Sequence, residues 1–169
     1  MSTYGISGGE IRVTATHPFR VVQLVNRNVH GALNIDRGER PLLLLRVTLP
    51  SKGFKSFDSG IQAATEDILG IRQFPEISFT SNQGIVRAGR RTGESEIFFE
   101  GDLTVAGKTM KDVSFPLFCA VTPDVTQCRF FLNLALSELG LAPPKPLGLR
   151  FEDAVKVEGE WVATREVKP

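Results

Sequence analysis

Apolar and polar residues alternate along most of the chain from Glu10 to Val167, and this period of two constrains the fold more than any other feature of the sequence. Successive side chains of a β-strand point to opposite faces, so the alternation indicates strands with one buried and one exposed face. Clusters of Gly, Pro, Asn and Asp interrupt it at intervals, which is typical of turns between antiparallel strands. The expected strands are Glu10–Thr16, Phe19–Val25, Val29–Asp36, Pro41–Leu49, Glu76–Ser81, Glu94–Val105, Val113–Thr122, Thr126–Ser137, Gly148–Val157 and Glu160–Glu166.

One segment, Ile61–Leu69, departs from this pattern and places its apolar residues at helical spacing. Asp58 or Ser59 can cap the start of a helix here, Gly70 can end it, and Pro75 prevents its continuation. We therefore predict one short helix, and we expect it to cover an open end of the sheet as a lid. The apolar side that must be buried comprises Ile61, Ala64, Ile68 and Leu69.

A sheet of many strands with a single helix exposes its edges unless it closes on itself, and exposed edges invite aggregation. We therefore predict an all-β fold in which an antiparallel sheet closes into a β-barrel with one short helix. The length of 169 residues suits a single domain, and no repeat or linker divides it, so we expect one domain over residues 1–169. Barrels of about eight strands are either filled by side chains or hold one small ligand.

Composition excludes several classes of protein. Apolar residues make up 41% of the chain and charged residues 23%, which is typical of a globular domain. The net charge of +1 provides no field that would attract nucleic acid, so we expect no nucleic-acid partner. The first twenty residues contain no apolar run of even seven, so we expect no integral membrane segment. We expect a cytoplasmic protein, or a periplasmic one if a signal peptide has been removed.

Residues that could carry catalysis or bind a metal are few. His17 and His30 are the only imidazoles, and Cys119 and Cys128 are the only thiols, too few for a zinc cluster unless the fold gathers them. Gly5–Gly9 spells the Gly-x-Ser-x-Gly motif of serine hydrolases, but no strand precedes it and no helix follows it. We therefore predict no catalytic residue, no metal site and no cofactor.

The two cysteines flank the turn signal Thr122–Val125, and symmetric pairing about this turn sets Cys119 opposite Cys128. Both side chains then point inward beside Leu117 and Phe130. We expect reduced thiols in a cytoplasmic protein, and a cross-strand disulfide if the protein is exported.

Several motifs resemble those of the bacterial YceI family. They occur in the family's order and spacing, and together they cover about His17 to Val162. They are the strand Phe74–Phe79, the hairpin Phe99–Thr109, the strand Val113–Leu117, the segment Leu139–Leu141 with Pro143 and Pro144, and the strand Phe151–Val155. The resemblance implies a lipocalin-like barrel that binds a long isoprenoid chain, such as a quinone or polyprenyl tail, and that is not an enzyme.

The chain has twelve Phe but only one Trp and one Tyr, and these phenylalanines either line a cavity or fill a closed core. The resemblance favours the cavity, and it also implies a polar contact from His17 near the entrance. A filled barrel acting as a structural or protein-interaction module is the alternative. An enzyme would need an ionisable pair inside the barrel, which the inward positions hardly supply. The sequence does not determine the oligomeric state, so a homodimer is one possible assembly. From strand parity, the expected ligand-binding residues are Ile77, Phe79, Phe99, Leu103, Phe115, Leu117, Phe130, Leu132 and Phe151.

Overall fold

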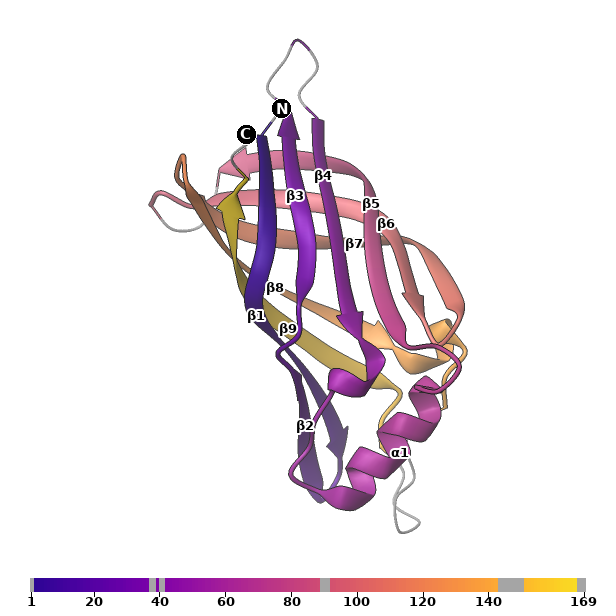
Figure 1. The fold of residues 1–169 in the computed structure, drawn as a ribbon. Coiled ribbons are helices and arrows are strands. Elements are labelled where there is room, and N and C mark those ends of the chain that lie inside the picture. The colour runs from indigo at the N-terminus through magenta and orange to yellow at the C-terminus, as the bar shows by residue number, and fades with distance from the viewer. Residues whose placement is uncertain (1, 37–38, 40–41, 89–91, 143–150, 167–169) are drawn as a thin grey trace.

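The computed structural model describes residues 2–36, 39, 42–88, 92–142 and 151–166, and Figure 1 shows their arrangement. Most of these residues lie in strands, as the alternating pattern predicts. The described part also contains one α-helix, α1 (Ser59–Leu69), and two short 3₁₀ helices, η1 (Ser51–Gly53) and η2 (Leu136–Leu139). The strands are β1 (Ser2–His17), β2 (Arg20–Asn26), β3 (His30–Asp36), β4 (Leu42–Pro50), β5 (Glu76–Ala88), β6 (Ser95–Val105), β7 (Lys108–Val121), β8 (Val125–Ala135) and β9 (Ala154–Arg165).

The strands form one antiparallel sheet in the order β2-β1-β3-β4-β5-β6-β7-β8-β9, and pairing of β1 with β9 closes it into a barrel. Strand β1 is long enough to have two neighbours on one side, because Ser2–Ser7 pair with β3 and Ile11–His17 pair with β2. On its other side β1 pairs with β9 along both segments. The predicted all-β, lipocalin-like barrel with one short helix is confirmed.

Strand β1 changes neighbours at a β-bulge. Its register with β9 shifts between Ile6 and Gly9, and Gly8 between them has a φ of 87°. A bulge adds a residue to one strand and bends it, and glycine adopts a positive φ without the steric strain of a Cβ atom. Ser7, the serine of the Gly-x-Ser-x-Gly motif, therefore lies inside a strand and not in the strand-to-helix turn of a hydrolase.

Helix α1 confirms the predicted helix and begins at Ser59. The carboxylate of Asp58 accepts a hydrogen bond from the backbone N–H of Ile61 at 3.0 Å, and Gly70 ends the helix in the left-handed conformation. Arg20 at the start of β2 forms an ion pair with Asp58, so the helix is tied to the β1–β2 hairpin. The N–H of Ile61, and after it the guanidinium of Arg20, hold the pKa of Asp58 below its ordinary value.

The last two predicted strands, Gly148–Val157 and Glu160–Glu166, are one strand in the structure, β9, and residues 148–150 lie outside the described residues. Gly159 suggests a turn in the sequence, but it lies directly opposite Phe130 of β8. A Cβ atom at position 159 would collide with the Phe130 ring, so the glycine makes room for that ring inside a continuous strand.

Two strands begin earlier than predicted. The segment Ser2–Gly9 is rich in Gly and Ser and lacks strong alternation, but β3 and β9 on either side hold it in the sheet. Strand β7 begins at Lys108 and not at Val113, because Ala106 and Gly107 form a tight turn with positive φ angles of 51° and 74°.

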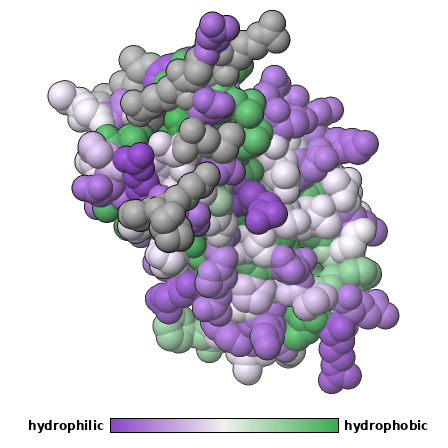
Figure 2. Space-filling view, turned by 45° about the horizontal axis from the view of Figure 1, so that its top comes forward, coloured by the Kyte–Doolittle hydropathy of each residue, from purple (hydrophilic) through white to green (hydrophobic). Residues whose placement is uncertain are grey.

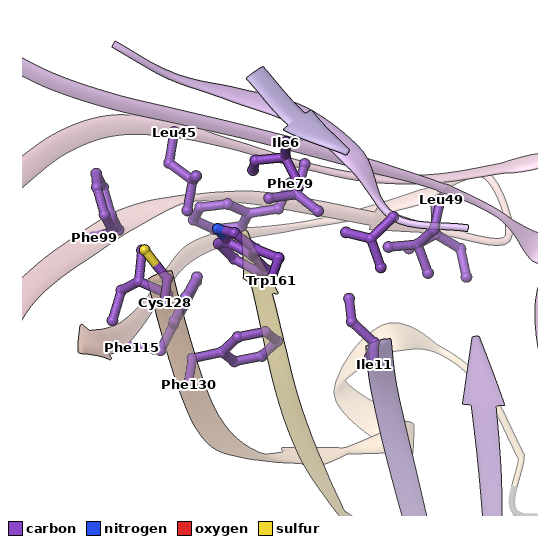
Figure 3. Packing of buried hydrophobic residues seen from close by; sticks show 14 of the residues in the cluster. Ile6, Ile11, Leu45, Leu49, Phe79, Phe99, Phe115, Cys128, Phe130 and Trp161 are labelled. Atoms are coloured by element: carbon purple, nitrogen blue, oxygen red, sulfur yellow. The ribbon is translucent and has the colours of Figure 1, made fainter. Parts of the chain in front are cut away.

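The interior has two parts, which Figure 3 shows from close by. Toward the chain termini, at the top of Figure 1, the interior holds buried core residues that do not line the cavity; we call this part the filled end. Toward α1 the barrel is hollow. The outer surface differs from this apolar interior. On the face shown in Figure 2, residues of hydrophilic or intermediate hydropathy predominate, and hydrophobic residues form scattered patches. The filled end consists of those buried core residues at this end of the barrel that do not line the cavity. They are Tyr4, Ile6, Leu33, Ile35, Leu43, Leu45, Ile97, Phe99, Leu117, Cys119, Cys128 and Ala163.

Candidate functional site

The hollow part of the barrel is an apolar cavity with a volume of about 200 Å³. Among the described residues, no Lys, Arg, His, Asp or Glu lies on its wall. Such a wall excludes water but accommodates hydrocarbon. The lining residues are Ile11, Val13, Ala15, Leu24, Val47, Leu49, Phe54, Thr65, Ile68, Leu69, Ile77, Ser78, Phe79, Leu103, Val105, Val113, Phe115, Phe130, Leu132, Leu134, Leu136, Leu139, Leu141, Val155, Val157 and Trp161.

Strand alternation positions most of this wall. Every second residue of a strand points inward, so β8 contributes Phe130, Leu132 and Leu134. The neighbouring strands β1 and β9 contribute mainly small side chains, such as Ala15 and Val157. Short side chains leave the axis of the barrel open at this level, whereas larger side chains such as Phe99 and Leu117 are fully buried in the filled end.

Four aromatic rings line the cavity where it meets the filled end. Phe79 and Phe115 have ring centroids 4.9 Å apart, Phe115 and Phe130 5.4 Å, and Phe130 and Trp161 5.4 Å. In Figure 3 these rings lie between the filled-end residues on one side and the cavity residues Ile11 and Leu49 on the other. We call them the aromatic floor.

Helix α1 covers the cavity at the opposite end. Thr65, Ile68 and Leu69 lie on the cavity wall, and Ile61 is fully buried beside them. The side chain of Gln62 fastens the helix to the preceding segment, since its Nε2 donates to the carbonyl of Phe54 at 2.9 Å. The expected burial of the apolar side of the helix against the barrel is therefore observed. Whether the helix opens as a lid stays a prediction.

The ten predicted ligand-binding residues divide into two groups in the structure. Those on the cavity wall are Ile77, Phe79, Leu103, Phe115, Phe130 and Leu132. Phe99 and Leu117 point inward as expected but belong to the filled end, so they do not reach the cavity. Strand parity separates inside from outside but does not tell at which level of the barrel a residue lies, which explains the difference.

His17 and Phe151 also lie apart from the cavity. They are buried against each other with ring centroids 5.7 Å apart. His17 Nδ1 accepts a hydrogen bond from the backbone N–H of Phe19 at 3.2 Å, which uses this nitrogen to hold the β1–β2 turn. The structure places His17 in a packed turn, because Pro18 folds the chain back directly after the imidazole, and its polar contact with a ligand stays a prediction.

Sequence reasoning missed part of the wall. Alternation in β1 and β9 contains the signal for Ile11, Val13 and Trp161, which share the inward parity of their strands. By contrast, Leu136 and Leu139 come from η2, a short 3₁₀ helix where the strand period does not apply. Only the tertiary structure brings this segment to the cavity.

Cys119 and Cys128 lie opposite each other on β7 and β8 with Cα atoms 4.2 Å apart, as the turn between these strands predicts. They form a disulfide, which corrects the expectation of reduced thiols. Both are buried in the filled end. The bond connects the two strands that carry Leu117 and Phe130 at the boundary between the filled end and the cavity.

The described residues contain no group of three or more His, Cys, Asp or Glu side chains that could hold a metal ion. Within the same part of the chain, no helix is long and apolar enough to cross a membrane.

A closed antiparallel barrel with an apolar cavity beneath a helix defines a structural class, the small antiparallel barrels with a hollow interior. Within this class, the fold is similar to that of Burkholderia cenocepacia BcnA, with a TM-score of 0.75 and 14% identity over 92% of this chain and 96% of that one. It is also similar to a polyisoprenoid-binding domain from Saccharophagus degradans, with a TM-score of 0.73 and 9% identity over 96% of this chain and 98% of that one.

The Campylobacter jejuni YCEI protein has the same fold, with a TM-score of 0.60 and 12% identity over 83% of this chain and 82% of that one. No protein-family model and no curated protein matches the sequence. The chain therefore has a YceI-like fold, as the resemblance in its sequence motifs implies, and the low identities limit the likeness to the fold.

Proposed function

We propose that the protein binds a long apolar ligand of the isoprenoid type in the cavity beneath α1, without chemical conversion. The observation that carries this proposal is the cavity itself, whose described wall is apolar apart from the side chains of Thr65 and Ser78. The similar domain from Saccharophagus degradans is described as polyisoprenoid-binding, which supports an isoprenoid as the class of ligand.

Burial of hydrocarbon supplies the binding free energy. Each methylene group removed from water contributes on the order of 0.8 kcal/mol, so a few isoprene units offset the loss of translational and rotational freedom. An apolar cavity of roughly 150 Å³ in another protein already binds benzene. The cavity of about 200 Å³ admits a comparable group in its present shape, and a longer tail would pass outward beside α1.

Two other functions are less well supported. A structural or protein-interaction module would have a filled core, whereas this barrel is filled at only one end. An enzyme acting on an apolar substrate would need an ionisable group against the substrate, and the described cavity wall carries none. Binding is therefore the function that the site supports best.

Native mass spectrometry of the protein mixed with geranylgeraniol tests the proposal. We expect one ligand per chain, because a cavity of about 200 Å³ does not accommodate two such molecules. A cavity-filling variant, Leu132→Trp, should lose the complex, while the same substitution on the outer face of the strand, Phe131→Trp, should keep it. Wild-type protein that gains no ligand mass at micromolar concentrations would contradict the proposed function.

We also propose that the protein works in an oxidising compartment such as a periplasm. The buried disulfide supports this, because structural disulfides persist mainly outside the reducing cytosol. Thiol titration of the denatured protein, isolated from its natural compartment without reductant, should detect no free thiol. Two free thiols per chain would instead support a cytoplasmic location.

A further inference from the structure

We propose that the α1 end of the barrel docks on the surface of a lipid bilayer through two exposed phenylalanine rings, those of Phe19 and Phe57. Phe19 lies in the two-residue loop between β1 and β2, and Phe57 lies shortly before α1. The inference goes beyond the proposed function and does not depend on it, because docking on a bilayer is measurable without a ligand in the cavity.

The first observation is the exposure of these rings. Phe19 is 92% exposed and Phe57 is fully exposed, whereas Phe54, three residues before Phe57, is buried and lines the cavity. Val21 on β2 is also mostly exposed. Single exposed apolar residues are common, but apolar residues that gather at one place on a surface mark an interaction site. We call Phe19, Val21 and Phe57 the apolar tip.

The second observation places the two rings at the same end of the molecule. An ion pair between Arg20 and Asp58 joins the residue after Phe19 to the residue after Phe57. In Figure 1 the loop between β1 and β2 and the first turn of α1 lie together at the bottom, opposite the chain termini. The two charges beside the rings compensate each other, which lowers the cost of bringing this end of the barrel close to a membrane.

The third observation is that hydrogen bonds fix the backbone beside both rings. The N–H of Phe19 donates to His17 Nδ1 at 3.2 Å. Two residues before Phe57, Lys55 exchanges two backbone hydrogen bonds with Val25 of β2, at 2.9 and 3.0 Å. The loops that carry the rings are therefore preorganised, and little backbone freedom is lost when the rings enter a bilayer.

The size and chemistry of the apolar tip favour a bilayer over a protein partner. Two aromatic rings and one Val offer roughly 500 Å² of surface, below the roughly 800 Å² that each partner buries in a stable protein interface. A bilayer requires no complementary shape, and Phe has no polar atom that would need a partner among the acyl chains. The exposed side chain of Lys55 suits the lipid phosphate groups just above the buried rings.

Fluorescence of tryptophan variants tests the docking. Trp161 is the only tryptophan of the chain and is buried, so an added surface tryptophan reports on its own surroundings. Phe19→Trp and Phe57→Trp should each shift their emission to the blue when phosphatidylcholine vesicles are added, and lipids brominated on their acyl chains should quench it. The matched control is Ile85→Trp, since Ile85 is half-exposed on β5 at the level of the filled end. Its emission should not change.

Co-sedimentation with phosphatidylcholine vesicles at millimolar lipid measures the affinity. Phe19→Ser and Phe57→Ser should each weaken vesicle binding by roughly fivefold, because each removes one apolar side chain that is partly buried in the bilayer. The double variant should stay in the supernatant, whereas Ile85→Ser should bind like the wild type. Both rings are exposed, so these variants should keep the wild-type fold, which thermal unfolding checks.

Several outcomes would overturn the docking. They are absence of wild-type binding to vesicles, unchanged binding of the double variant, and equal blue shifts for Ile85→Trp and Phe19→Trp. Binding that requires phosphatidylglycerol and does not depend on the rings would show electrostatic adsorption instead. A wild-type dimer that the double variant loses, measured by analytical ultracentrifugation without vesicles, would assign the apolar tip to a second copy of the chain. The proposed function is tested separately, by native mass spectrometry without vesicles.

Discussion

The two ends of this barrel have the same kind of strands but different interiors. In the filled end, Leu33, Phe99 and Leu117 have no exposed surface, and a disulfide joins two neighbouring strands. In the cavity end, small residues such as Ala15 and Val157 leave the axis open, and α1 covers the opening. The difference separates two roles: close packing at one end stabilises the barrel, and the space at the other end is where we propose that the ligand binds.

This comparison predicts that equal truncations have unequal effects. Leu117→Ala in the filled end should lower the free energy of unfolding by about 3–5 kcal/mol, because the closely packed surroundings cannot collapse into the space. Leu132→Ala on the cavity wall should lower it by about 1–2 kcal/mol, since that side chain already lacks contacts on one side. Urea denaturation followed by circular dichroism measures both values. Equal losses would show that the cavity closes in solution.

A charge on the floor should abolish binding. Phe130→Arg places an unpaired guanidinium against the apolar cavity, so we expect affinity for geranylgeraniol to fall by more than about tenfold. The matched control is Phe131→Arg, because Phe131 is the next residue of β8 and points to the outer face, where it stacks on Phe118. Native mass spectrometry compares the two variants after thermal unfolding has shown that both are folded. If Phe130→Arg still binds geranylgeraniol, the aromatic floor is not part of the ligand-binding site.

Weakening the contact of α1 with the barrel tests the lid. Leu69→Asp replaces an apolar residue of the cavity wall, so it should destabilise the closed position and accelerate release of a bound ligand severalfold. Ala63→Asp introduces the same charge on the exposed side of α1 and should release the ligand at the wild-type rate. Stopped-flow release of a fluorescent isoprenoid analogue provides the rates. If Leu69→Asp is destabilised but releases the ligand no faster, α1 is a fixed plug.

The smallest expected effect is a dependence of release on acidic pH. The pKa of Asp58 is lower in the folded chain than its ordinary value of 3.8, so its contribution to helix capping is complete above that value and is lost as the pH falls through the folded pKa. Ligand release from the wild type should therefore accelerate modestly below about pH 4. Asp58→Asn keeps a capping oxygen but does not titrate, so release from this variant should change less over the same range. If the release rates of the two proteins change in parallel with pH, the pH dependence does not come from Asp58.

Much of the fold follows from local patterns. Alternation predicts most strands, Asp58 and Gly70 predict both ends of α1, and the turn at Thr122–Val125 predicts the opposition of Cys119 and Cys128. Each of these depends on residues close together in the chain, where the physical interactions are local. The bonded state of the cysteines was predicted only conditionally, as reduced thiols in a cytoplasmic protein and a disulfide in an exported one, because it depends on the compartment as well as on geometry.

The sequence by itself determined which side chains face the interior, because the period of two assigns each strand residue to one side of the sheet. Only the tertiary structure decided the level at which they lie. Phe99 and Phe115 pair directly across β6 and β7, yet Phe115 lines the cavity and Phe99 is packed in the filled end. The level depends on the stagger between strands, on the bulge at Gly8 and on the closure of β1 against β9. These are long-range pairings, so no local pattern reveals where the barrel is filled and where it is hollow.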